Sequence, residues 1–79
     1  MSEELREEAG YEFIIVGDTE RFNDCLITPC GKKLARAKEV LQKCIDQSDE
    51  NLVRLCKGHS NFRIERIKSA DAWWNGYLD

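Results

Sequence analysis

The residues best suited to chemistry are four cysteines and one histidine. Four residues separate Cys25 from Cys30, and Cys56 precedes His59 by three positions. Structural zinc takes four thiolates or imidazoles in a tetrahedral array, so Cys25, Cys30, Cys56 and His59 form one candidate zinc set. Their spacing differs from the usual double knuckle. Free cysteine also behaves as a small core hydrophobe, and Cys44 and Cys56 fall on apolar sides of expected helices. We therefore expect core packing, with no metal and no other cofactor.

Cys30 has a separate argument for reactivity. The pair Thr28-Pro29 predicts a helix start, with threonine as the N-cap and proline at the first helical position. Cys30 would then lie in the first turn, where a helix N-terminus lowers the pKa of a thiol. A nucleophile also needs a base and an oxyanion site, and nothing in the sequence places His59 nearby. A thiol- or zinc-dependent protein centred on Cys30 is thus an alternative, while we expect no enzyme.

Aromatic and arginine residues near the C-terminus have the composition of a protein-binding hot spot. Trp73 and Trp74 are adjacent, so they cannot face the same way in a regular element. One interpretation is that they cover a thin core. The other is that one tryptophan, with Tyr77, Arg63 and Arg66, binds a protein partner, because Trp, Tyr and Arg dominate hot spots.

Charge is unevenly distributed over the 79 residues, whose net charge is −3. Residues 1–10 hold four Glu and one Arg, whereas residues 11–79 hold eleven acids and eleven bases. In the loop that follows the first apolar segment, Asp18, Glu20 and Asp24 add three further candidates for an acidic, partner-binding surface.

The charge balance argues against nucleic acid as a direct ligand. The pI is near 5.1, and strong nucleic-acid binders usually carry a basic excess over the whole domain. Residues 31–68 nevertheless hold ten bases against five acids. A regulator that contacts nucleic acid therefore stays as an alternative, through Lys32, Lys33, Arg36 and Lys43.

Targeting signals are not evident in the sequence. No run of 18 apolar residues is present, so we expect no membrane association. The N-terminus lacks the basic and apolar regions of a signal peptide. We expect a cytoplasmic protein with reduced cysteines.

Apolar periodicity predicts the elements that must position these residues. The expected order is strand, strand, helix, helix, strand, over residues 11–16, 24–28, 29–47, 48–57 and 61–68. The first segment is apolar on both faces and should be a central strand. The helix at 29–47 has one apolar stripe, which indicates packing on a sheet.

These elements define an α+β class. We expect a two-layer domain in which a three-stranded, mainly antiparallel sheet carries two helices packed on one face. Residues 1–10 are expected to form an acidic flexible arm, and residues 11–79 a single domain. The strand order stays open.

Four segments carry a resemblance to known proteins: YEFIIVGDTERFNDCL at residues 11–26, CGK at 30–32, GHSNFRIE at 58–65 and AWWN at 72–75. Together they resemble small uncharacterised proteins encoded in conjugative and phage-like elements of Gram-positive gut bacteria. The resemblance implies a setting only. Mobile elements often carry small proteins that block host defence nucleases, and many of these, including anti-CRISPR proteins, are acidic and act by binding.

We therefore expect a non-catalytic protein-binding module from a mobile element. Its most specific form is an anti-CRISPR-like or anti-restriction inhibitor of a host defence nuclease, in which the acidic arm and loop compete with nucleic acid for a basic groove. The expected partner is a protein, with a homodimer as a further alternative.

Overall fold

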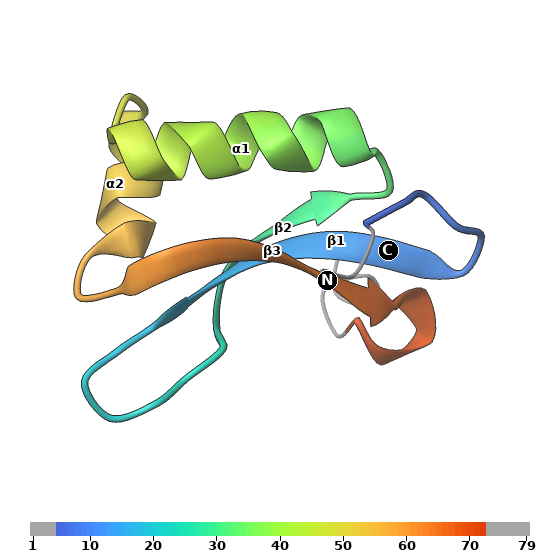
Figure 1. The fold of residues 1–79 in the computed structure, drawn as a ribbon, viewed down its shortest axis with the longest axis horizontal. Helices are drawn as coiled ribbons and strands as arrows, with labels where there is room; N and C mark the ends of the chain where they lie inside the picture. Colours follow the sequence, from blue (N-terminus) through green and yellow to red (C-terminus); the bar gives the residue numbers. More distant parts are fainter. Residues whose placement is uncertain (1–4, 73–79) are drawn as a thin grey trace.

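The computed structural model describes residues 5–72 and has the predicted α+β architecture. Its elements are β1 (Tyr11–Asp18), β2 (Cys25–Gly31), α1 (Leu34–Asp46), α2 (Glu50–Cys56), β3 (Ser60–Lys68) and the short 3-10 helix η1 (Ser69–Asp71). The strands form one antiparallel sheet in the order β2-β1-β3. Both helices lie over the same face of this sheet (Figure 1).

β1 is the central strand, as its sequence predicts. Its β-branched and aromatic residues favour extended backbone. Phe13 and Ile15 are buried on the face that carries the helices, while Glu12 and Val16 are buried on the opposite face. β1 therefore contributes buried side chains to both faces of the sheet.

The core lies between the helices and the sheet. Five buried residues form it: Ile15, Ile27, Val40, Cys44 and Cys56. Cys44 and Cys56 come from α1 and α2, and they are 1% and 3% exposed. The expectation that these two cysteines fill the core is confirmed.

The helix start predicted at Thr28-Pro29 is wrong. Both residues belong to β2, and α1 begins at Leu34. A proline lacks the N–H that a central strand needs, but an edge strand accommodates it, and β2 is an edge strand. Gly31, with a φ of +83°, ends β2 and turns the chain toward α1. The local pattern fits a helix start and an edge strand equally well, and the pairing with β1 decides between them.

α2 begins two residues later than the sequence predicts. Asp49 is its N-cap, and its carboxylate accepts hydrogen bonds from the backbone N–H groups of Asn51 and Leu52 at 2.9 and 3.2 Å. Gly58 follows the helix with a φ of +81°, which is the predicted role of a glycine after a helix end. The chain then enters β3 one residue earlier than expected.

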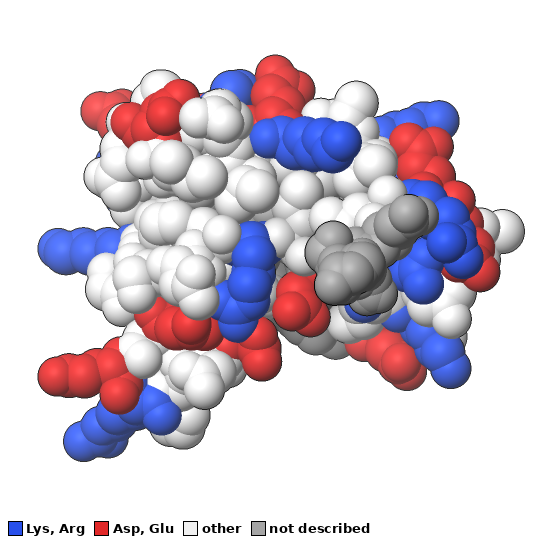
Figure 2. Space-filling view, in the orientation of Figure 1, with Lys and Arg blue, Asp and Glu red and all other residues white. Residues whose placement is uncertain are grey.

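Charges of both signs are interspersed on one face of the molecule. On the face drawn in Figure 2, acidic and basic side chains alternate, and neither sign forms one continuous area. On this face, the uneven distribution of charge along the sequence does not produce an area of one sign.

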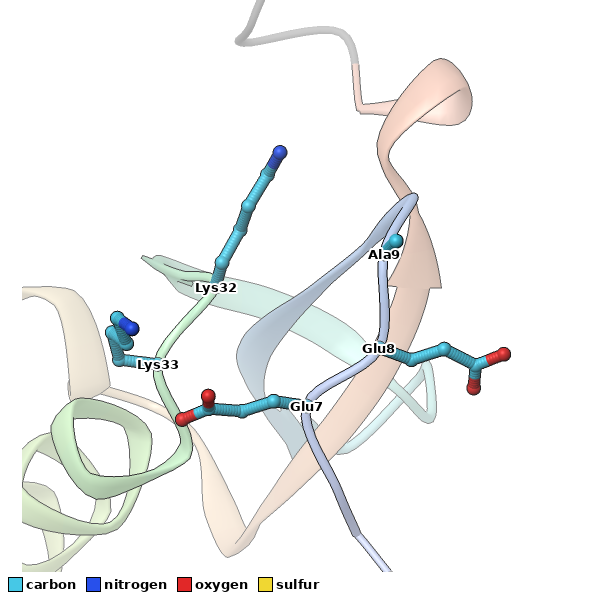
Figure 3. Close-up of a pocket in the computed structure, with 5 residues that line it drawn as sticks. All are labelled: Glu7, Glu8, Ala9, Lys32 and Lys33. Carbon is cyan, nitrogen blue, oxygen red and sulfur yellow. The ribbon is translucent and has the colours of Figure 1, made fainter.

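α1 receives its N-terminal cap from the N-terminal arm. Its own N-cap residue, Lys33, makes no side-chain capping hydrogen bond, and its first turn holds no acidic residue. Instead, Glu7 points toward the start of the helix (Figure 3), and its Oε2 accepts from the backbone N–H of Leu34 at 2.9 Å. A carboxylate at this position satisfies one orphan N–H and complements the helix dipole. Glu8 extends to the other side of the arm and pairs with Arg66 at 2.8 Å.

Removal of this cap should destabilise the fold. For Glu7→Ala we expect a loss of about 1 kcal/mol in the free energy of unfolding, the usual cost of losing an N-terminal cap. Urea denaturation followed by circular dichroism measures it. Arg6→Ala is the matched control in the same arm and should cost less. Equal stability of Glu7→Ala and the unsubstituted protein would show that the cap contributes nothing.

Candidate functional site

The hairpin between β1 and β2 ends in residues 19–24, which we call the hairpin tip. Thr19 organises it: its N–H donates to the carbonyl of Phe22 at 2.7 Å, and its Oγ1 accepts from the N–H groups of Phe22 and Arg21 at 2.9 and 3.3 Å. Threonine hydroxyls stabilise turns in this way. The tip is therefore a structured turn.

Phe22 is exposed on this structured turn. Its exposed fraction is 65%, the largest among the large apolar side chains of residues 5–72. Ile45 and Leu55 are 54% and 48% exposed, but they lie on helices near the core. A phenylalanine this exposed at the end of a hairpin contributes little to the packing of the fold.

The base of the hairpin tip is fixed by a group of charged side chains. Asp18 Oδ1 accepts from the backbone N–H of Asp24 at 3.1 Å, and Asp24 has a left-handed φ of +56°. Arg63, on β3, pairs with Asp18 at 3.0 Å and also with Asp24. Asn61 donates from Nδ2 to Asp18 Oδ2 at 3.1 Å. Side chains from β3 thus hold both ends of the tip.

The electrostatics of this group follow from its hydrogen bonds. Those from Asn61, from the Asp24 backbone and from Arg63 lower the pKa of Asp18 to about 2. The hydrogen bonds that Arg63 donates to Asp18 and, with a smaller effect, to Asp24 raise the pKa of Arg63. Both Asp18 and Arg63 are therefore charged throughout the neutral range.

The structure brings together only part of the predicted binding set. Asp18, Asp24 and Arg63 meet at the base of the tip, and Glu20 lies exposed within it. Arg66 lies toward the other end of β3, where it stacks over the ring of Tyr11 at 4.6 Å and pairs with Glu8. Three further members of the predicted set lie outside the described residues: Trp73, Trp74 and Tyr77.

Phe22 is absent from the predicted binding set because residues 17–23 are mostly polar and predict a loop. One feature of the sequence does indicate Phe22. Threonine is one of the residues that stabilise turns through the side-chain hydroxyl, Thr19 lies in this loop, and Phe22 is the one large apolar side chain in residues 17–23. The pairing of Arg63 with Asp18 and Asp24 has no such signal, since it joins residues 45 and 39 positions apart.

Cys30 does not have the environment that the sequence predicts. It lies in β2 rather than in a helical first turn, and it packs against the core. Burial raises its pKa to about 11, although Arg36 acts in the opposite direction. Burial, followed by a hydrogen bond with Cys56, raises the pKa of Cys44 to about 12. The physical basis for a reactive Cys30 thiolate is therefore removed.

The candidate zinc ligands do not converge. Cys25 and Cys30 lie at opposite ends of β2, and the ring of His59 contacts the Lys57 carbonyl at 3.1 Å through Nδ1. Within residues 5–72, no three cysteine, histidine or acidic side chains gather to hold a metal ion. The geometry gives the zinc alternative no support.

Comparisons with known proteins identify no relative of this chain. The chain matches no protein-family model, and searches of curated proteins and of solved structures found no match. In the described part of the chain, no helix is long and apolar enough to cross a membrane.

Acidification should reveal the contribution of Asp18. Its folded pKa of about 2 lies below the ordinary 3.8, so the unfolded chain binds the proton first. The stability that Asp18 contributes is then fully present above about pH 4 and is lost as the pH falls toward 2. Urea denaturation between about pH 2 and pH 6 measures this. The free energy of unfolding of Asp18→Asn should fall furthest below that of the unsubstituted protein near pH 6, and the difference should shrink toward pH 2.

The control for this experiment is Glu20→Gln, which removes a carboxylate from the same loop. Glu20 makes no hydrogen bond or ion pair with other residues of the 5–72 range. Its substitution should leave the pH profile nearly unchanged. If Asp18→Asn and Glu20→Gln gave the same profile, the hydrogen bonds of Asp18 would have no energetic role.

Cys30 should react slowly with alkylating reagents. A pKa of about 11, against an ordinary 9.0, leaves about a hundredfold less thiolate at neutral pH. Mass spectrometry after iodoacetamide treatment should show Cys30 labelled far more slowly in the native protein than in urea. Faster labelling in the native state would restore the thiol-dependent alternative.

Proposed function

We propose that the protein is a non-catalytic protein-binding module that uses Phe22 as its anchor. The observation that carries this proposal is the 65% exposure of Phe22 on a turn held by its own hydrogen bonds. Buried aromatic anchors supply much of the affinity of protein interfaces. A loop that is already ordered loses little conformational entropy on binding. The favoured partner is a protein with an apolar pocket wide enough for a phenyl ring.

The charges around the tip suit this role better than mimicry of nucleic acid. Asp18 and Asp24 are paired with Arg63, while Glu7 caps α1 and Glu8 pairs with Arg66. Four carboxylates that could have formed an acidic surface are thus engaged within the fold. Inhibition of a host defence nuclease is the most specific form of the proposal, and it would proceed by insertion of Phe22 rather than by competition through negative charge.

Photo-crosslinking at the tip tests the proposal. A photoreactive phenylalanine analogue at position 22 should capture one dominant protein from host cells, and mass spectrometry identifies it. Against that purified partner, Phe22→Ala should weaken binding by about thirtyfold or more, as expected for a hot-spot side chain. Calorimetry or surface plasmon resonance gives the two dissociation constants.

Leu55→Ala is the matched control, because Leu55 is also exposed and apolar but lies on α2. It should leave the affinity within about twofold of the unsubstituted protein. Phe22→Ala should unfold at the same urea concentration as the unsubstituted protein, since the side chain packs little. Equal binding by Phe22→Ala and the unsubstituted protein would contradict the proposal.

A further inference from the structure

The sheet has two edges, and only one of them suits pairing with another strand. β2 contains Pro29 and has two register irregularities in its pairing with β1. Proline and bulges are devices by which proteins block edge pairing. β3 is nine residues long, contains no proline, and pairs with β1 without interruption from Lys68 to Arg63. Within residues 5–72 only β1 pairs with β3, so its outer edge faces no other strand of the described fold.

We propose that two copies of the chain associate through the outer edges of their β3 strands. The strands would pair antiparallel about a twofold axis, and the two three-stranded sheets would become one continuous sheet. Main-chain hydrogen bonds supply affinity in this mode of recognition, and the facing side chains set the register. The inference goes beyond the protein-binding function proposed above and does not rest on it.

The charges of β3 specify one register for this pairing. With the twofold axis at Ile64, Arg63 of each copy lies opposite Glu65 of the other, and Ile64 meets Ile64. Opposite charges directly across a strand pair are stabilising, and like charges are destabilising. An axis at position 63 would place Arg63 against Arg63, and an axis at position 65 would place Glu65 against Glu65. A twofold axis perpendicular to the sheet must pass between two copies of the same residue. Of the three central positions, only position 64 places opposite charges across the strand pair.

The side chains involved are available for this contact. Arg63 and Glu65 are 31% and 47% exposed, and they lie on the face of the sheet away from the helices, where Arg63 Nε is 3.8 Å from Glu65 Oε2. Arginine has five N–H donors. In Arg63, Nη2 serves Asp18 and Asp24, and Nη1 donates to the Asn61 carbonyl at 2.7 Å. The second N–H of Nη1 and the N–H of Nε can then meet a carboxylate of the second copy. Charges on an edge strand usually prevent pairing; here their Arg-x-Glu order makes the edge complementary to itself.

The resulting dimer has a defined shape. The twofold axis is perpendicular to the sheet, so the helices of both copies cover the same face. Each hairpin tip lies near the Ser60 end of its own β3, and antiparallel pairing places the two tips at opposite ends of the joined sheet. Phe22 is then remote from the seam, and association and partner binding are separate properties.

Sedimentation equilibrium tests the proposal with the whole chain. Between roughly 10 µM and 1 mM, a protein that associates in this way should pass from monomer toward dimer. Glu65→Lys places a lysine opposite Arg63 twice in the dimer and should raise the dissociation constant about tenfold or more. Glu39→Lys, with the same charge change on α1, should dimerise like the unsubstituted protein, and so should Phe22→Ala.

Two results would overturn the proposal. One is a monomer at every concentration, and the other is a dimer that Glu65→Lys leaves unchanged, since its seam would lie elsewhere. Circular dichroism of each variant should show the spectrum of the folded, unsubstituted protein.

Amide hydrogen exchange of the unsubstituted protein provides a test without substitution. Amides of β3 should become more protected as the concentration rises, while those of β2 should not. Concentration-dependent protection confined to β2 or to the helices would also reject pairing through β3.

Discussion

The rest of the structure depends on β1 being paired along both edges and buried on both faces. β2 and β3 have no strand contact with each other within residues 5–72, and each is held in the sheet by β1. Phe13 and Ile15 lie under the helices, while Val16 is buried on the other side. A chain of 79 residues can bury only a small core, so a single eight-residue strand serves both faces. Its last residue, Asp18, also begins the hydrogen-bonded group that fixes the hairpin tip.

Electrostatic pairing in this protein links segments that are distant in the sequence. Arg63 joins β3 to both ends of the hairpin tip, Arg66 joins β3 to Glu8, and Glu7 joins the arm to α1. Each contact is at least partly exposed, so each individual contribution to stability is small. Together they determine where the arm and the tip lie relative to the sheet. The acidic composition therefore serves mainly internal contacts in the described fold, and the surface that remains has mixed charge.

Much of the fold could be predicted from local sequence patterns, because β1, α2 and β3 carry strong local signals. The apolar segment at the start of the domain, the glycine at position 58 and the amphipathic stripe of α1 each led to the correct element. Thr28-Pro29 misled because threonine and proline suit an edge strand as well as a helix start, and only the pairing with β1 separates the two. The same error placed Cys30 in a helical turn and gave it the wrong pKa direction. The site was harder to predict, since Arg63 reaches residues 45 and 39 positions away, and periodicity contains no information about such contacts.

The order of the strands has a consequence for synthesis on the ribosome. β1 leaves the ribosome before β2 and β3, yet its longer partner, β3, begins only at Ser60. At roughly 5–20 residues per second, one edge of β1 has no partner for several seconds. Of its two partners in the described sheet, β2 alone is available to β1 during that interval, and the hydrogen bond from the Asp24 backbone to Asp18 lies within this early hairpin. Asp18 would thus first close the nascent hairpin and only later receive Arg63 and Asn61, so that one carboxylate assists two successive stages of assembly.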